Sequence, residues 1–179
     1  FEGLQIGFTV EEMALRVKNL LYSIGLVNDF APLVYVVGHG ASSVNNTHYA
    51  GYDCGACSGR PGSVNARVVS YMANHPKVRE ILAKEGIEIP NSTQFIGALH
   101  DTTRDEIAFF DLDILWEENK KQHLNNEQVF KSALDTNAKE RSRRFESIDS
   151  SQTAEEVREH IRSRAVSLFE PRPELNHAT

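Results

Sequence analysis

The apolar run at 33–37 (LVYVV) constrains the fold of this chain more than any other feature. It is rich in β-branched residues, follows Pro32 and ends at Gly38. Continuous runs of this kind are typical of strands in parallel sheets, where both faces are buried. We therefore expect a central, parallel strand at 33–37.

Helical patterns alternate with further strand-like runs along the chain. Thr9 and Glu12 have the spacing of a capping box, which predicts a helix from there to about Ser23. The other expected helices are 65–74, 77–84, 126–147 and 153–168, and the other expected strands are 93–99 and 106–111. This alternation predicts a layered α/β domain, with a small and mostly parallel sheet flanked by helices.

The length of 179 residues fits one domain with its own core. We expect two parts in it, a ligand-bearing part at 33–111 and a helical C-terminal part at 126–170. The chain starts at Phe1 and its first methionine is Met13, so we expect a piece of a longer protein. No apolar run reaches the ~20 residues that a membrane-crossing helix requires.

The charge of the chain argues against nucleic acid as a partner. The formal net charge is -6 and the pI is about 5.6, whereas a phosphate-backbone binder needs a basic surface. The one basic stretch, 139–144 (KERSRR), is expected to be the solvated face of a helix.

His39, Cys54 and Cys57 are the residues best suited to bind a metal. His39 directly follows the first strand, and both cysteines lie in the glycine-rich segment after it. Imidazole and thiolate are ligands that zinc prefers, and a segment of this length can bring His39 and Cys54 together. The alternative is that His39 is a hydrogen-bonding loop residue and Cys54 a small buried hydrophobe.

A second polar cluster, 100–105 (HDTTRD), follows the strand expected at 93–99. Its acidic and hydroxyl side chains suit a turn in which they cap neighbouring backbone groups. In the alternative interpretation, His100 and Asp101 orient a ligand of the metal. The histidines at 48, 75, 123, 160 and 177 lack a ligand-like context and are expected at the surface.

The pair Cys54 and Cys57 also has the C-x-x-C spacing of a redox disulfide. Such a motif needs a helix that starts at the first cysteine, and the following 58–62 (SGRPG) disfavours one. A thiol–disulfide module therefore remains an alternative function, as does a non-catalytic structural interaction domain.

Four ordered motifs give the chain a resemblance to the DabA family, the large subunits of an energy-coupled inorganic carbon transporter. They are GHGASSVNN at 38–46, DCGAC at 53–57, NAR at 65–67 and HDTT at 100–103. The resemblance implies a core similar to β-carbonic anhydrase, truncated here. It also implies a zinc ion held by two cysteines and a histidine, with an aspartate nearby.

In this sequence His39 matches the histidine ligand of the family and Cys54 matches its second cysteine. The first cysteine and the catalytic aspartate are implied to lie upstream of Phe1, so the chain is expected to carry half of the site and to be inactive alone. Cys57 is a candidate substitute ligand. For the whole protein, the resemblance implies zinc-assisted hydration of carbon dioxide to bicarbonate.

The resemblance further implies a partner and a location. The partner is an integral-membrane, ion-translocating subunit that makes hydration one-way. The parent would be a peripheral protein on the cytoplasmic face of the cell membrane.

Overall fold

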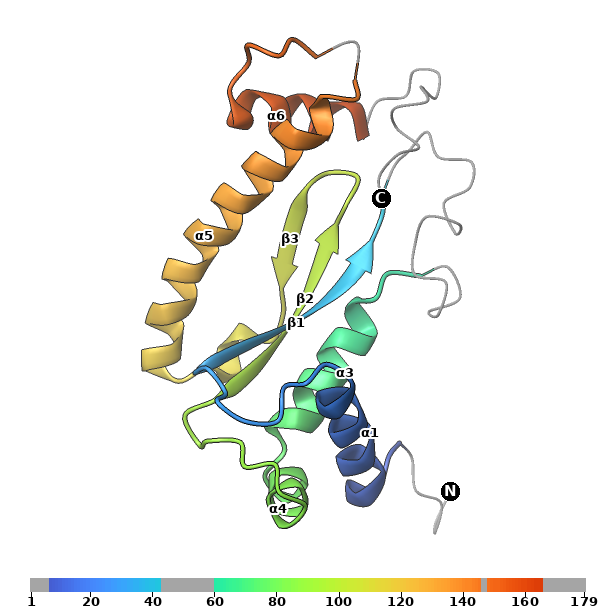
Figure 1. Ribbon diagram of the computed structural model, residues 1–179, viewed down its shortest axis with the longest axis vertical. Coiled ribbons are helices and arrows are strands. Elements are labelled where there is room, and N and C mark those ends of the chain that lie inside the picture. The colour runs from blue at the N-terminus through green and yellow to red at the C-terminus, as the bar shows by residue number, and fades with distance from the viewer. Residues whose placement is uncertain (1–6, 43–59, 146–147, 166–179) are drawn as a thin grey trace.

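A three-stranded sheet organises the computed structural model, which describes residues 7–42, 60–145 and 148–165 (Figure 1). The strands β1 (Leu33–Gly40), β2 (Gln94–Asp101) and β3 (Glu106–Phe109) lie in that order. β1 and β2 are parallel, whereas β2 and β3 form an antiparallel hairpin. The expected α/β class is confirmed, with a mixed sheet.

β1 does not have the position that its composition predicts. Within the described residues it is an edge strand, and β2 is central. The prediction of a central strand at 33–37 is therefore wrong for this part of the chain. An apolar run shows that the two faces of a strand are covered, but it does not show that both hydrogen-bonding edges are paired.

The helices α1 (Val10–Ser23), α3 (Ser63–Asn74) and α4 (Pro76–Lys84) form the layer on one side of the sheet (Figure 1). Thr9 and Glu12 cap α1 reciprocally, at 3.1 and 2.9 Å, as their spacing predicts. Pro76 occupies the first turn of α4. The core of this layer comprises Met13, Ala14, Val17, Leu21, Phe30, Met72, Ala73, Val78, Leu82, Ile87, Ile89 and Phe95.

α3 approaches the sheet closely because a glycine faces it. A Cβ atom at Gly97 in β2 would lie 2.9 Å from the Cα atom of Arg67. Arg67 also binds both carboxylate oxygens of Asp111, at 2.8 and 2.7 Å, and so ties α3 to the segment after β3. Asp111 has a positive φ of 55° and precedes the short 3₁₀ helix η2 (Leu112–Ile114).

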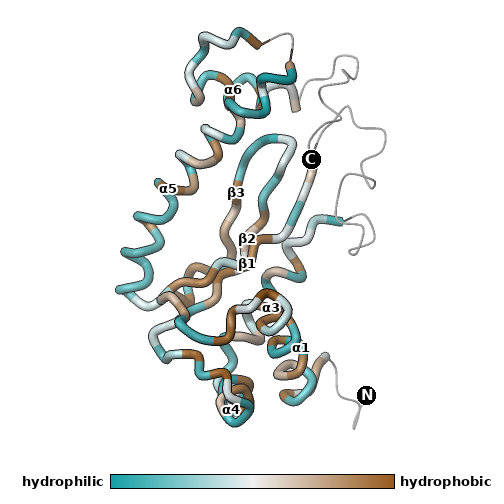
Figure 2. The backbone as a smooth tube through the Cα atoms, viewed as in Figure 1, coloured by the Kyte–Doolittle hydropathy of each residue, from teal (hydrophilic) through white to brown (hydrophobic). Residues whose placement is uncertain are grey.

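The long helix α5 (Glu117–Ser142) covers the other side of the sheet, and most of its residues are hydrophilic (Figures 1 and 2). The sequence predicts its start at 126, nine residues too late. The first turns carry no apolar stripe, because the side chains they bury are polar, Asn119 and His123. The ring of Tyr35 in β1 makes an edge contact with Phe130 of α5, at 5.0 Å between centroids.

The last helix, α6 (Ala154–Ala165), packs against the end of α5. Thr153 accepts a hydrogen bond from the backbone of Glu156, as the repeated capping spacing predicts. A small separate core joins the two helices: Ala138, Phe145, Ile148, Val157 and Ile161. Among the helices in the described ranges, none is both long enough and apolar enough to cross a membrane.

Candidate functional site

The ends of β1 and β2 bring the two predicted polar segments together. His39 lies opposite His100 in the parallel register, and Gly40 lies opposite Asp101. Opposite residues of parallel strands point to the same face. Because side chains alternate along a strand, both histidines share the face of Tyr35, which α5 covers. The sheet thus places His39 and His100 side by side.

Asp101 fixes the loops that leave both strands. Its carboxylate accepts hydrogen bonds from the backbone and the hydroxyl of Ser42, just after β1. It also accepts from the backbone N–H groups of Thr103 and Arg104, at 3.0 and 3.3 Å. These contacts are the capping role expected for a turn. Asp101 therefore holds the exit of β1 against the exit of β2.

Asp105, in the turn after β2, is fully buried. It accepts a hydrogen bond from Asn137 at 2.7 Å, and one of its oxygens lies 3.0 Å from a guanidinium nitrogen of Arg141. Both partners lie on α5. Burial lowers the pKa of Arg141 from its usual value, and the charges of Asp105 and Asp101 oppose that effect. The stretch at 139–144 is thus more than a solvated face, because Arg141 anchors α5 to this turn.

His100 faces this buried cluster. Its Nε2 atom lies 3.8 Å from an oxygen of Asp105, which is within the range of an ion pair but too long for a hydrogen bond. His100 therefore adds a second imidazole to the polar end of the sheet.

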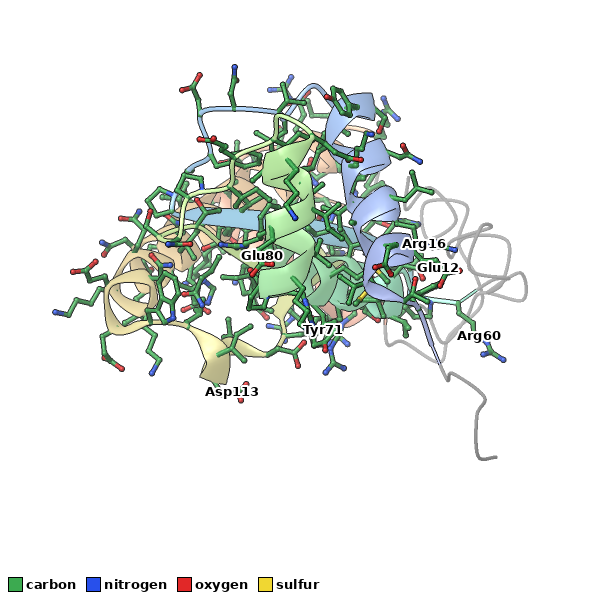
Figure 3. The ribbon with its side chains drawn as sticks, turned by 90° about the horizontal axis from the view of Figure 1, so that it is seen from below. Glu12, Arg16, Arg60, Tyr71, Glu80 and Asp113 are labelled. Atoms are coloured by element: carbon green, nitrogen blue, oxygen red, sulfur yellow. The ribbon has the colours of Figure 1, made fainter. Side chains whose placement is uncertain are left out.

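The described residues on both sides of the segment that carries the two cysteines lie close to His39. The N–H of Gly62, just before α3, donates to the carbonyl of His39 at 2.7 Å. A Cβ atom at Gly38 would lie 2.5 Å from the backbone of Gly62, so this contact requires glycine. Arg60, the first described residue after 43–59, extends away from the helices (Figure 3). Cys54 and Cys57 lie outside the described residues.

Of the predicted metal ligands His39, Cys54 and Cys57, only His39 lies within the described residues. In 7–42, 60–145 and 148–165, no group of three or more His, Cys, Asp or Glu side chains is arranged to hold a metal ion. His39 is of a residue type that zinc accepts, and His100 lies opposite it on the neighbouring strand.

A buried histidine that sequence reasoning missed lies further along the same face. His123 of α5 is only 4% exposed, and its Nδ1 atom lies 2.9 Å from the hydroxyl of Tyr35. Asn126 donates to that hydroxyl at 3.1 Å. The expectation of a surface position for His123 is therefore wrong. The one feature of the sequence that could have indicated its burial is the i, i+3 spacing of His123 and Asn126. That spacing puts two polar side chains on one face of the helix.

Fold and site together define a class of protein: an α/β domain whose candidate chemistry lies at the carboxyl ends of parallel strands. Within that class the chain belongs to the DabA family, described as probable inorganic carbon transporter subunit DabA, whose family model matches residues 2–179.

Two curated relatives carry the same description. The one from Azotobacter vinelandii is 70% identical over 99% of this chain, and the one from Nitrosospira multiformis is 64% identical over 99%. The chain spans only 21% and 20% of these two relatives. A third relative, from Rhodopirellula baltica, is 42% identical. No solved structure is a significant match to the chain, so the expected likeness to β-carbonic anhydrase stays a prediction.

Proposed function

We propose that this chain supplies His39 and Cys54 as two ligands of a zinc ion, in a transporter subunit that captures carbon dioxide as bicarbonate. The proposal extends the description of its relatives as inorganic carbon transporter subunits. The observation that carries it is the hydrogen bond between Gly62 and His39. That contact makes the cysteine-bearing segment return to the histidine.

Chain geometry supports pairing His39 with Cys54. Cys54 lies eight positions before Gly62, a stretch that reaches at most about 28 Å when fully extended. At the other end of the segment, Ser42 lies three positions after His39 and is hydrogen-bonded to Asp101. The residues that flank 43–59 are thus anchored near the imidazole of His39. Bringing Cys54 to that imidazole would therefore cost only the conformational entropy of closing a short loop.

The residues of this chain would have separate tasks in such a site. His39 and Cys54 would bind the metal, and Asp101 would keep the exits of the two strands together. Zinc, when bound, supplies the Lewis acidity that activates water toward carbon dioxide. His100 would accept or donate one hydrogen bond beside that metal, and the buried pair of Asp105 and Arg141 would keep its loop in place.

The assembly belongs to the same proposal. The relatives are described as subunits of a transporter, and a subunit implies at least one partner. We infer an integral-membrane, ion-translocating partner and a peripheral position on the cytoplasmic face. Carbon dioxide hydration would then be coupled to ion movement through that partner.

Metal analysis of a family-length polypeptide that carries this sequence tests the proposal. We expect close to one zinc ion per chain in the parent, and loss of most of that zinc in His39→Ala and in Cys54→Ser. Cys57→Ser is the matched control, because it removes a thiol three positions away, and it should leave the zinc content unchanged. Circular dichroism checks that all variants are folded.

Three outcomes would contradict this assignment. Full zinc content in both His39→Ala and Cys54→Ser would remove these residues from the metal site. Loss of zinc in Cys57→Ser with retention in Cys54→Ser would assign the thiolate to the other cysteine. A parent that holds no zinc but cycles between dithiol and disulfide would support a redox module.

A further inference from the structure

We infer that the outer edge of β1 is a docking site for an extended segment of the same polypeptide, drawn from the part of a DabA chain that lies outside these 179 residues. The segment would pair with Leu33–Val37 as a fourth strand. This inference does not depend on the proposed zinc chemistry.

The hydrogen-bonding pattern of β1 identifies the open edge. The carbonyls of Pro32 and Gly40 accept hydrogen bonds from Gln94 and Thr102, so the even-numbered residues of β1 face β2. The odd-numbered residues therefore direct their N–H and C=O groups outward. The outward bond from Gly62 to His39 confirms this alternation. Leu33, Tyr35 and Val37 have no such partner within the described part of the chain.

The open edge lies between two covered faces. On one face, Val34 and Val36 pack against the core beneath α1, α3 and α4. On the other, Leu33 and Tyr35 pack near Leu115 and Phe109. Helices on both faces are typical of the interior of a parallel sheet. Val37, which is 45% exposed, is the most exposed apolar side chain of the strand.

β1 also lacks the features that protect a permanent edge. Exposed edge strands are usually short or carry charges, proline or a bulge. The opposite edge strand, β3, follows that rule, because it has four residues and starts at Glu106. β1 has eight residues, and no charged side chain or proline interrupts it. Such an edge suits strand addition.

The length of the relatives points to the occupant. About four fifths of the Azotobacter vinelandii relative lies outside the matched region, since this chain covers 21% of it. A segment of the same polypeptide docks at high effective concentration, which a separate molecule lacks. A second copy of this chain is the competing occupant, and the test distinguishes the two.

Photo-crosslinking in the family-length polypeptide tests the inference. With Val37→p-benzoylphenylalanine, we expect one dominant crosslinked peptide, from outside the 179 residues and from the same molecule. Mixing isotope-labelled and unlabelled protein shows whether the crosslink joins two copies. Leu124, an exposed apolar residue of α5, is the control position and should give no such dominant peptide. A crosslink to a second copy, or to residues within the 179, would overturn the inference.

Hydrogen exchange gives an independent measurement. In the family-length polypeptide, we expect the outward amides of Tyr35 and Val37 to exchange as slowly as the inward amides of Val34 and Val36. If the outward amides exchange at least 100-fold faster than the inward ones, the edge is open and the inference fails. Zinc content, measured on the same sample, reports separately on the proposed metal site.

Two separate proline substitutions test whether the outside segment docks through backbone hydrogen bonds to β1. Val37→Pro removes an outward N–H, which an edge position without a partner tolerates. Val36→Pro removes an inward N–H and breaks the ladder to β2. We expect Val37→Pro to leave β1 paired with β2, while the outward amide of Tyr35 loses its protection and exchanges at least 100-fold faster than the inward amide of Val34. Slow exchange at Tyr35 that persists in full would overturn the backbone-pairing mechanism.

Discussion

Arg141 and Asp105 form an ion pair at 3.0 Å between the long helix α5 and the turn that follows β2. The carboxylate is fully buried and also accepts a hydrogen bond from Asn137. A charge in this environment is tolerated only when its partners are in place. The pair therefore fixes the orientation of α5 against the polar end of the sheet, where His39 and His100 lie.

Removal of the cation from this pair should destabilise the fold strongly. Arg141→Met leaves Asp105 buried without its counter-charge, and we expect a loss of about 3–5 kcal/mol in the free energy of unfolding. Urea denaturation measures it. The double variant Asp105→Asn with Arg141→Met should recover part of that loss. Lys120→Met breaks an exposed pair with Glu117 and should cost less than about 1 kcal/mol. Equal losses in the two single variants would contradict the role of burial.

Gly38 is expected to tolerate no side chain. A Cβ atom there would lie 2.5 Å from backbone atoms of Gly62, which cannot move away as a flexible side chain would. Gly38→Ala should therefore displace the start of α3 and destabilise the protein by about 1–3 kcal/mol. At Gly40, the nearest atom is a methyl carbon of Leu99 at 3.1 Å, so Gly40→Ala is the milder control. Similar midpoints in urea for the two variants would contradict this prediction.

The buried histidine of α5 predicts a pH dependence of stability. Burial lowers the pKa of His123 below its usual value of 6.5, and the charge of Glu127 opposes this only in part. Below pH 6.5 the unfolded chain takes up a proton that the folded chain resists, so stability should fall as the pH falls. We expect a lower urea midpoint at pH 5.5 than at pH 7.5.

One variant isolates the contribution of His123. In His123→Gln, the part of the pH dependence between 5.5 and 7.5 that comes from this histidine should disappear. An unaltered slope in His123→Gln would show that other groups cause the effect.

The 179-residue chain alone should have little or no carbon dioxide hydration activity, because the family resemblance implies that other essential groups lie upstream. Stopped-flow measurement with a pH indicator checks this. The same preparation should titrate with two free thiols after metal removal under non-oxidising conditions. Robust hydration by the isolated chain would contradict the half-site interpretation, and a stable disulfide would favour the redox alternative.

Local signals predicted most of the helices and strands. The capping boxes at Thr9 and Thr153 and the proline at position 76 fix helix starts through bonds made within a few residues. The start of α5 was missed, because its first turns bury Asn119 and His123 in place of apolar residues. Hydrophobic periodicity cannot detect a helix face that is held by polar contacts.

The candidate site was predictable only in part. The sequence predicted strands that end near His39 and His100, and the parallel register places these two residues opposite each other. The burial of Asp105 could not be read from the sequence, because its partners Asn137 and Arg141 lie more than 30 positions away. That β1 lies at the edge of the sheet in the described part of the chain was missed for a related reason, since strand neighbours are set by tertiary structure.

The hydrogen bond between Gly62 and His39 closes a loop in the chain. On the other side of that loop, Ser42 is held to the carboxylate of Asp101. A length change engineered between Ser42 and Gly62, with both of these contacts kept, therefore need not disturb the strands and helices.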